Sequence, residues 1–160
     1  MLSIRLICVG KMKEKHYISA VSEYAKRLVP YCKFEILELA EEKLPPSPSE
    51  AEISAALNRE AAEVNKNIPN GSFCVAMCIE GELLSSEGLA RLLSDCASHG
   101  YSRFCFIVGS SNGLADSLKT SCELRLSMSK MTFPHHLARV MLAEQVYRSI
   151  MINEGTKYHK

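Results

Sequence analysis

The side chains best suited to chemistry gather at the end of the chain. The last three residues are Tyr158, His159 and Lys160, and Arg148 precedes them by ten positions. A histidine can take up a proton near neutral pH, arginine and lysine can stabilise an anion, and a tyrosine ring can stack on a nucleobase. Residues 130–160 carry five basic residues against two acidic ones, so this end is the better face for a phosphate backbone. A solvated tail remains the ordinary interpretation of such a segment.

A helix has to position this tail. Thr132 is a candidate cap and Pro134 suits a first helical turn, so the sequence predicts a helix that runs to about Asn153. Its apolar residues lie on more than one face, namely Leu137, Val140, Met141, Leu142, Val146, Tyr147, Ile150 and Met151. This pattern predicts burial against the chain's own sheet and against a second subunit. The remaining polar strip consists of Arg139, Glu144, Gln145 and Arg148, in which Glu144 and Arg148 also fit a simple solvated ion pair.

A second group of candidate residues forms a glycine-bearing turn, Gly109 to Gly113, after an apolar run. Ligands of open parallel sheets bind beyond the carboxyl ends of strands, where glycine lets the backbone approach a cofactor closely. The turn lacks the G-x-G-x-x-G pattern, and the chain has neither a Walker A motif nor G-x-S-x-G. Dinucleotide binding, P-loop chemistry and α/β-hydrolase chemistry are therefore disfavoured. A plain connection between a strand and a helix is the alternative.

The rest of the chain alternates strands and helices. Apolar or alternating runs predict strands at 2–9, 33–39, 72–79, 103–108 and 123–128, and helical periodicity predicts helices at 15–28, 50–67, 87–98 and 114–121. The proline-rich stretch 44–49 interrupts this order as a loop. Continuous apolar runs between helices favour a parallel sheet covered on both faces. The fold class predicted is α/β.

Composition limits the possible classes of protein. The 160 residues are 47% hydrophobic and 23% charged, as in an ordinary single domain, so we expect one domain over residues 1–160. The seven cysteines include no C-x-x-C pair, which argues against a metal site and a redox pair. No signal peptide and no apolar run long enough to cross a membrane is present. These features predict a cytoplasmic protein with its thiols in the core.

Several motifs together resemble a known family. They are SMSKMTFPHH at 127–136, RV at 139–140, EQVYR at 144–148, YHK at 158–160, IRLICVGK at 4–11 and LSSEGL at 84–89. This set closely resembles the bacterial ribosomal RNA large subunit methyltransferase H family, over essentially the whole chain. That family belongs to the SPOUT methyltransferases. The resemblance therefore implies a SPOUT α/β fold with a parallel sheet and a deep C-terminal trefoil knot, which periodicity alone does not predict.

The resemblance also implies a cofactor, S-adenosyl-L-methionine, held in the knot by three loops. Carried over by position, its binding residues are Met77, Gly109, Met128, Ser129, Lys130, Met131, Thr132 and Phe133. Most of them would act through backbone amides and carbonyls. The family commonly has two glycines in succession where this chain has Gly109 and Ser110, so a narrower pocket is expected here.

The implied substrate is a pseudouridine of 23S ribosomal RNA, methylated at N3 on the assembled 70S ribosome by a homodimer. N3 is a weakly acidic imide nitrogen, so a base or an anion-stabilising cation would assist the reaction. The tail offers both kinds of group, with His159 as a possible base, Arg148 and Lys160 as cations and Tyr158 as a stacking surface. We expect no metal, no membrane and no DNA as partners.

Two other functions fit the same sequence. One is a knotted methyltransferase that acts on transfer RNA, which the lack of an added RNA-binding domain disfavours. The other is a ribosome-associated binding module without activity, which the intact segments 128–133 and 158–160 disfavour. A cofactor-binding measurement distinguishes the binding module from an enzyme.

Overall fold

A computed structural model, which describes all residues 1–160, has one five-stranded sheet in which every pairing is parallel. Its order is β2-β1-β4-β3-β5. The strands are β1 (Ser3–Val9), β2 (Lys33–Leu39), β3 (Phe73–Leu83), β4 (Arg103–Val108) and β5 (Leu124–Ser127). All their carboxyl ends therefore lie at one edge of the sheet. The predicted α/β class with a parallel sheet is confirmed.

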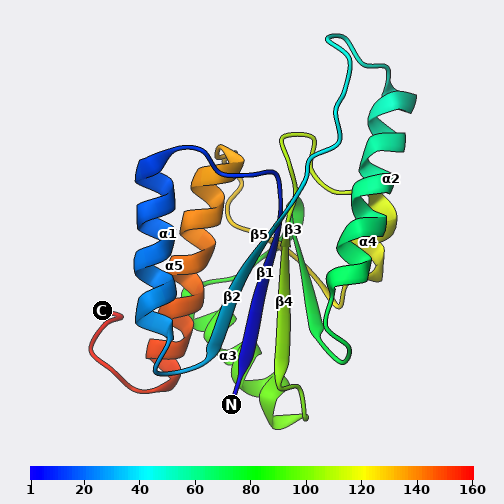
Figure 1. Cartoon of the computed structure of the whole chain (residues 1–160). Helices are drawn as coiled ribbons and strands as arrows, with labels where there is room; N and C mark the ends of the chain where they lie inside the picture. Colours follow the sequence, from blue (N-terminus) through cyan, green and yellow to red (C-terminus); the bar gives the residue numbers. More distant parts are fainter.

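Helices cover both faces of the sheet (Figure 1). The helices are α1 (Lys15–Leu28), α2 (Glu50–Asn67), α3 (Ser86–Ser98), α4 (Asp116–Ser121) and α5 (His135–Asn153). Figure 1 shows α1, α3 and α5 on one side of the strands and α2 with α4 on the other. Each helix lies within a few residues of its predicted position, and the proline-rich stretch forms the irregular loop before α2.

Two hydrophobic cores explain the uninterrupted apolar strands. Leu6 and Cys8 of β1 belong to the core under α1, α3 and α5, whereas Ile7 and Val9 belong to the core under α2 and α4. Side chains of one strand point alternately to opposite faces, so a sheet covered twice needs apolar residues throughout. Each fully buried leucine or isoleucine contributes about 1.5 to 3 kcal/mol.

The prediction that the thiols lie in the core is confirmed for four of the seven cysteines. All seven thiols are free, and four of them are buried. Burial raises the pKa of both Cys8 and Cys32 to about 11, so these thiols stay protonated at neutral pH. No helix is long and apolar enough to span a bilayer.

The end of β3 departs from regular pairing. The strand was predicted to stop at residue 79 but continues to Leu83, and Leu126 of β5 pairs with both Met77 and Glu82 because the register shifts between them. A Cβ on Gly81 would lie 2.6 Å from the carbonyl carbon of Leu126, so β3 curves tightly against β5 here. The chain then leaves β5 through residues 128–134 to reach α5. This close crossing is consistent with the predicted trefoil knot.

The start of α5 corrects two predictions. Pro134 occupies the cap position and no side chain caps the helix, so Thr132 is not the cap. Arg139, predicted to lie on a solvated polar strip, is only 1% exposed. Leu137, Val140, Met141 and Tyr147, on the apolar side of α5 that was expected to be buried against a second subunit, are half-buried in the single chain, where α5 packs against α1 and α3. Burial of this side against a second subunit stays a prediction.

Candidate active site

A cavity of about 670 Å³ lies at the carboxyl ends of β3, β4 and β5, and we call it the strand-end cavity. Its lining includes residues 77–80, 108–114 and most of 127–135. Seven of the eight residues assigned to the cofactor by resemblance line it, namely Met77, Gly109, Met128, Ser129, Met131, Thr132 and Phe133. The eighth, Lys130, is exposed and lies outside the lining. The parallel sheet thus brings together segments that are far apart in the sequence.

Backbone forms the tightest part of this cavity. A Cβ on Gly109 would lie 2.6 Å from the carbonyl carbon of Gly113, so the turn closes directly over this glycine. Ser110 and Gly113 form a short antiparallel bridge, and Gly113 has a φ of +80°, which favours glycine. A larger residue at Gly109 would therefore disrupt the turn itself, and not only the space for a ligand. Ser110 is buried and lines the cavity.

The cavity also contains charged and apolar groups that the sequence did not indicate. Lys119 of α4 pairs with Glu80 at 2.5 Å, and the hydrogen bond from Lys119 holds the pKa of Glu80 below its usual range. Burial lowers the pKa of His135, so its imidazole is neutral at pH 7. Ile79 and Met131 are 63% and 73% exposed at this cavity and offer apolar surface to a planar ring.

Buried polar contacts fasten the first turns of α5 beside the strand-end cavity. Arg139 donates from Nη1 to Glu38 at 2.7 Å and from Nη2 to the carbonyl oxygen of Gly10 at 3.1 Å. One turn earlier, His136 pairs with Glu14 at 2.7 Å. Because His135 and Ala138 of the same turns line the cavity, these contacts set the position of one of its walls.

The tail is docked against the middle of α5 rather than solvated. Tyr158 donates its hydroxyl proton to Oε1 of Glu144 at 3.1 Å, and its ring packs edge-on against Tyr147 at a centroid distance of 4.8 Å. Arg148 donates to the same Glu144 oxygen from Nε and Nη2, and its guanidinium lies 4.8 Å from the Tyr158 ring centre. Burial and the bond to Glu144 raise the pKa of Tyr158 to about 12. Tyr158 therefore remains a proton donor at neutral pH.

His159 is held between two charged partners. Arg148 Nη1 lies 3.1 Å from His159 Nδ1, and Nε2 lies 2.9 Å from the Glu87 carboxylate. Because an arginine only donates, Nδ1 must accept and Nε2 must carry the proton, which describes a neutral imidazole. Its lone pair is therefore occupied, and His159 can take up another proton only after Arg148 moves away. Three predicted catalytic residues thus meet, whereas Lys160 is exposed and apart from them.

The predicted catalytic and cofactor residues do not meet directly within one chain. His135 at the strand-end cavity and Glu144 at the docked tail are nine residues apart on α5, or about 14 Å at 1.5 Å per residue. Neither Arg148 nor any residue of the tail lines that cavity. Another part of the chain therefore has to lie between the predicted cofactor residues and the predicted catalytic residues.

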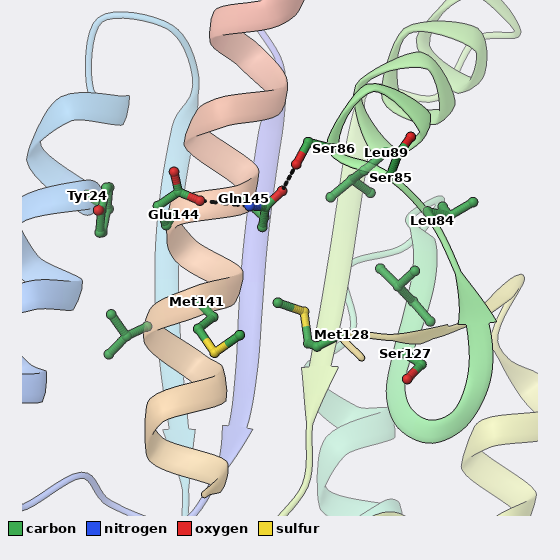
Figure 2. A pocket seen from close by; sticks show the side chains of 12 residues that line it. Tyr24, Leu84, Ser85, Ser86, Leu89, Ser127, Met128, Met141, Glu144 and Gln145 are labelled. Atoms are coloured by element: carbon green, nitrogen blue, oxygen red, sulfur yellow. Dashed lines mark hydrogen bonds between the residues drawn. The ribbon is translucent and has the colours of Figure 1, made fainter. Parts of the chain in front are cut away.

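A second cavity, of about 530 Å³, fills this interval, and we call it the α3–α5 cavity (Figure 2). It shares Ser127 and Met128 with the strand-end cavity, and Glu144 and Gln145 line it from α5. Ser86 of α3 donates to Gln145 at 2.7 Å, and Gln145 donates to Glu144 at 2.9 Å. Figure 2 shows the first bond crossing from α3 to α5 and the second joining the two neighbouring residues of α5. The α3–α5 cavity thus shares a wall with the strand-end cavity, and Glu144 connects it to the tail.

Comparisons with known proteins define the class of protein that has this fold and site. The family model described as "Predicted SPOUT methyltransferase" matches residues 2–159. Two solved structures share the fold at only 11% and 12% identity. A "probable methylase family protein" from Haemophilus influenzae has a TM-score of 0.57 and covers 98% of this chain and 70% of its own. A "Probable Methyltransferase" from Bordetella pertussis has a TM-score of 0.58 and covers 92% of this chain and 95% of its own. The molecule is a SPOUT methyltransferase.

Closer relatives specify the family within that class. Ribosomal RNA large subunit methyltransferase H of Streptococcus equi subsp. zooepidemicus and that of Clostridioides difficile are each 43% identical over 159 residues, which is 99% of this chain and all of theirs. The enzyme of the same name from Oenococcus oeni is 42% identical over 160 residues, all of both chains. The chain belongs to the ribosomal RNA large subunit methyltransferase H family, as the sequence motifs predicted.

Sequence reasoning missed the residues that connect the two sites. Glu87, Ser86 and Gln145 had no assigned role, although LSSEGL and EQVYR were recognised as family motifs. Lys119 lies 39 residues from Glu80 and belongs to no recognised motif. Only the packing of α3 and α4 beside the strand ends reveals these contacts.

Proposed function

We propose that this protein uses S-adenosyl-L-methionine to methylate N3 of a pseudouridine in 23S ribosomal RNA on the assembled 70S ribosome. It does so as a cytoplasmic homodimer. The observation that carries the proposal is the strand-end cavity, which gathers seven of the eight positions that family resemblance assigns to the cofactor. The names of the relatives support ribosomal RNA as the substrate.

The residues of the strand-end cavity fit the proposed cofactor. Backbone at the ends of β3, β4 and β5 offers amides and carbonyls, and Ile79 and Met131 offer exposed apolar surface for an adenine ring. S-adenosylmethionine supplies, when bound, a methyl group on a positively charged sulfur. The neutral imidazole of His135 adds no positive charge to this side of the cavity.

The protein's own groups have to position the uracil ring and assist loss of the N3 proton. Arg148 is a permanent cation that can stabilise the imide anion, and Tyr158 remains protonated and can donate or stack. His159 can act as the base only in a conformation that frees Nδ1 from Arg148. The candidate bases are therefore His159 in that conformation and a solvent molecule.

The homodimer rests on two features of the surface. Ile79 and Leu83 of β3 and Met131 of the loop after β5 are exposed large apolar residues, and apolar surface beyond that used by the cofactor favours an interface. The tail is separated from the strand-end cavity of its own chain, so a second copy is the natural source of tail groups there. Light scattering at micromolar concentration should give twice the chain mass, and a monomer would contradict this part of the proposal.

The direct test of the activity uses mass spectrometry of ribosomal RNA. Ribosomes from a strain that lacks the protein should miss one methyl group on a 23S pseudouridine, and the purified protein with S-adenosylmethionine should restore it. A strain whose 23S RNA retains every methyl group would contradict the proposal. A missing methyl group in transfer RNA would assign the protein to the other substrate class.

A further inference from the structure

The α3–α5 cavity combines apolar and polar walls, as a nucleobase site does. Its walls include apolar side chains on α5 and α3, such as Met141 and Leu89, which can cover the faces of a planar ring. The side chains of Glu144 and Gln145 lie next to each other in it (Figure 2). Its shared wall, Ser127 and Met128, borders the strand-end cavity where the methyl group would be held.

The orientation of the Gln145 amide follows from its neighbours. An ionised Glu144 can only accept, so the nitrogen of Gln145 must face it, and the oxygen then accepts from Ser86. One N–H of Gln145 is left without a protein partner. Glu144 Oε1 is occupied by Arg148 and Tyr158, whereas Oε2 accepts only from Gln145 and keeps a free lone pair.

These two free groups form an acceptor and a donor side by side, 2.9 Å apart at their parent atoms. A cis amide presents the complementary pair, an N–H next to a carbonyl. Pseudouridine has such an edge at N1–H and the C2 carbonyl, because its ring is attached to the sugar through carbon. Uridine presents a C–H at the position equivalent to N1–H, so the edge distinguishes the two nucleosides.

We propose that the α3–α5 cavity binds the pseudouridine base, with Glu144 accepting from N1–H and Gln145 donating to the C2 carbonyl. The inference rests on the proposed function and names the residues that select its substrate. N3 flanks the same carbonyl on its other side, away from the edge that Glu144 holds. The N–H of Gln145 also stabilises the anion formed at N3, because the imide charge is shared with the C2 oxygen.

The test compares two substrates: ribosomes with pseudouridine at the target position and ribosomes with uridine there. The analogue without the N–H leaves the Glu144 acceptor unsatisfied, so the wild-type rate ratio should be on the order of 100. Glu144→Gln should reduce this ratio at least tenfold, because it replaces the charged acceptor for N1–H with a neutral amide and so removes most of the preference for the ring that carries N1–H. Gln145→Met should lower both rates and leave the ratio within about twofold.

A matched control and a binding measurement complete the test. Glu154→Gln changes an exposed carboxylate just beyond the same helix and should alter neither rate. With S-adenosylhomocysteine present, pseudouridine nucleoside should shift the methyl NMR signals of Met128 and Met141 in the wild-type protein, and uridine should not. Light scattering should show that the variants retain the oligomeric state of the wild type.

Specific outcomes would overturn the assignment. An unchanged substrate ratio in Glu144→Gln, or methionine signals that respond equally to both nucleosides, would remove the base from this cavity. Loss of activity that accompanies only a change in oligomeric state would show that a second copy occupies it. If the wild-type protein methylates neither ribosome, the proposed function fails instead, and the nucleoside titration still tests the cavity.

Discussion

The two halves of α5 border two sites of different composition, one formed mainly by backbone and the other by charged side chains. Its first turns face the strand-end cavity, where a turn closed over Gly109 and three strand ends supply backbone and apolar surface. Its middle carries Glu144 and Arg148, where charged side chains hold the tail through hydrogen bonds. Backbone sites depend on close approach, and side-chain sites depend on the identity of individual groups. We therefore expect substitutions to separate cofactor binding from methyl transfer.

The largest effect is expected at the turn that closes the strand-end cavity. Gly109→Ala places a Cβ against the backbone of Gly113, which cannot move without opening the turn. We expect S-adenosylmethionine affinity, measured by calorimetry, to fall at least about 100-fold, or about 2.7 kcal/mol. Gly88→Ala is the matched control, since its Cβ would approach only the Ser85 and Leu84 side chains. Equal affinities for both variants would contradict a backbone-built cofactor site.

An intermediate effect is expected where α5 is fastened to the β1 end. Arg139→Met removes a guanidinium that is 1% exposed, leaves the Gly10 carbonyl without its side-chain donor, and leaves the Glu38 carboxylate with only the backbone N–H of Met12. The free energy of unfolding should fall by about 1 to 2 kcal/mol in guanidinium titrations. Arg91→Met, on the exposed side of α3, should change it by less than about 0.5 kcal/mol. A loss for Arg139→Met no larger than that control would show that the buried contacts do not hold α5.

The smallest effect is expected for the hydroxyl of Tyr158. Its pKa is raised from 10.0 to about 12, so the docked tail gains stability from the neutral phenol below pH 10 and loses it as pH rises toward 12. Tyrosinate absorbance should show one late-titrating group that is missing in Tyr158→Phe. That variant should lose only a few-fold in methyl transfer, with the same pH dependence between pH 6 and 9. A changed profile in that range would mean that Tyr158 titrates during the reaction.

Sequence periodicity predicted the sheet well because its strands are buried on both faces. A continuous apolar run such as residues 103–108 is typical of a strand in a parallel sheet that is buried on both faces. The end of β3 was missed because Glu82 and Leu83 pair with β5 only after a register shift, which depends on a segment more than 40 positions later. A local sequence pattern contains no information on pairing between segments so far apart in the chain.

The candidate site, like the fold, was predicted only in part from the sequence. Family motifs identified the strand-end segments, since their positions along the chain coincide with strand ends. They did not indicate that Arg139 is buried, because a charged residue on a helix is normally solvated and its partners Glu38 and Gly10 lie over 100 residues away. They also gave no indication that the tail docks on Glu144 and Glu87, which requires α3 and α5 to be neighbours.

The most direct test of the separation between the two sites is a protein that ends at residue 157. Removal of Tyr158, His159 and Lys160 leaves every residue of the strand-end cavity in place. We predict S-adenosylmethionine affinity within about threefold of wild type, and single-turnover methyl transfer to 70S ribosomes reduced at least about 100-fold. Methyl transfer at the wild-type rate, or a parallel loss of cofactor affinity, would contradict the assignment of binding and chemistry to different parts of α5.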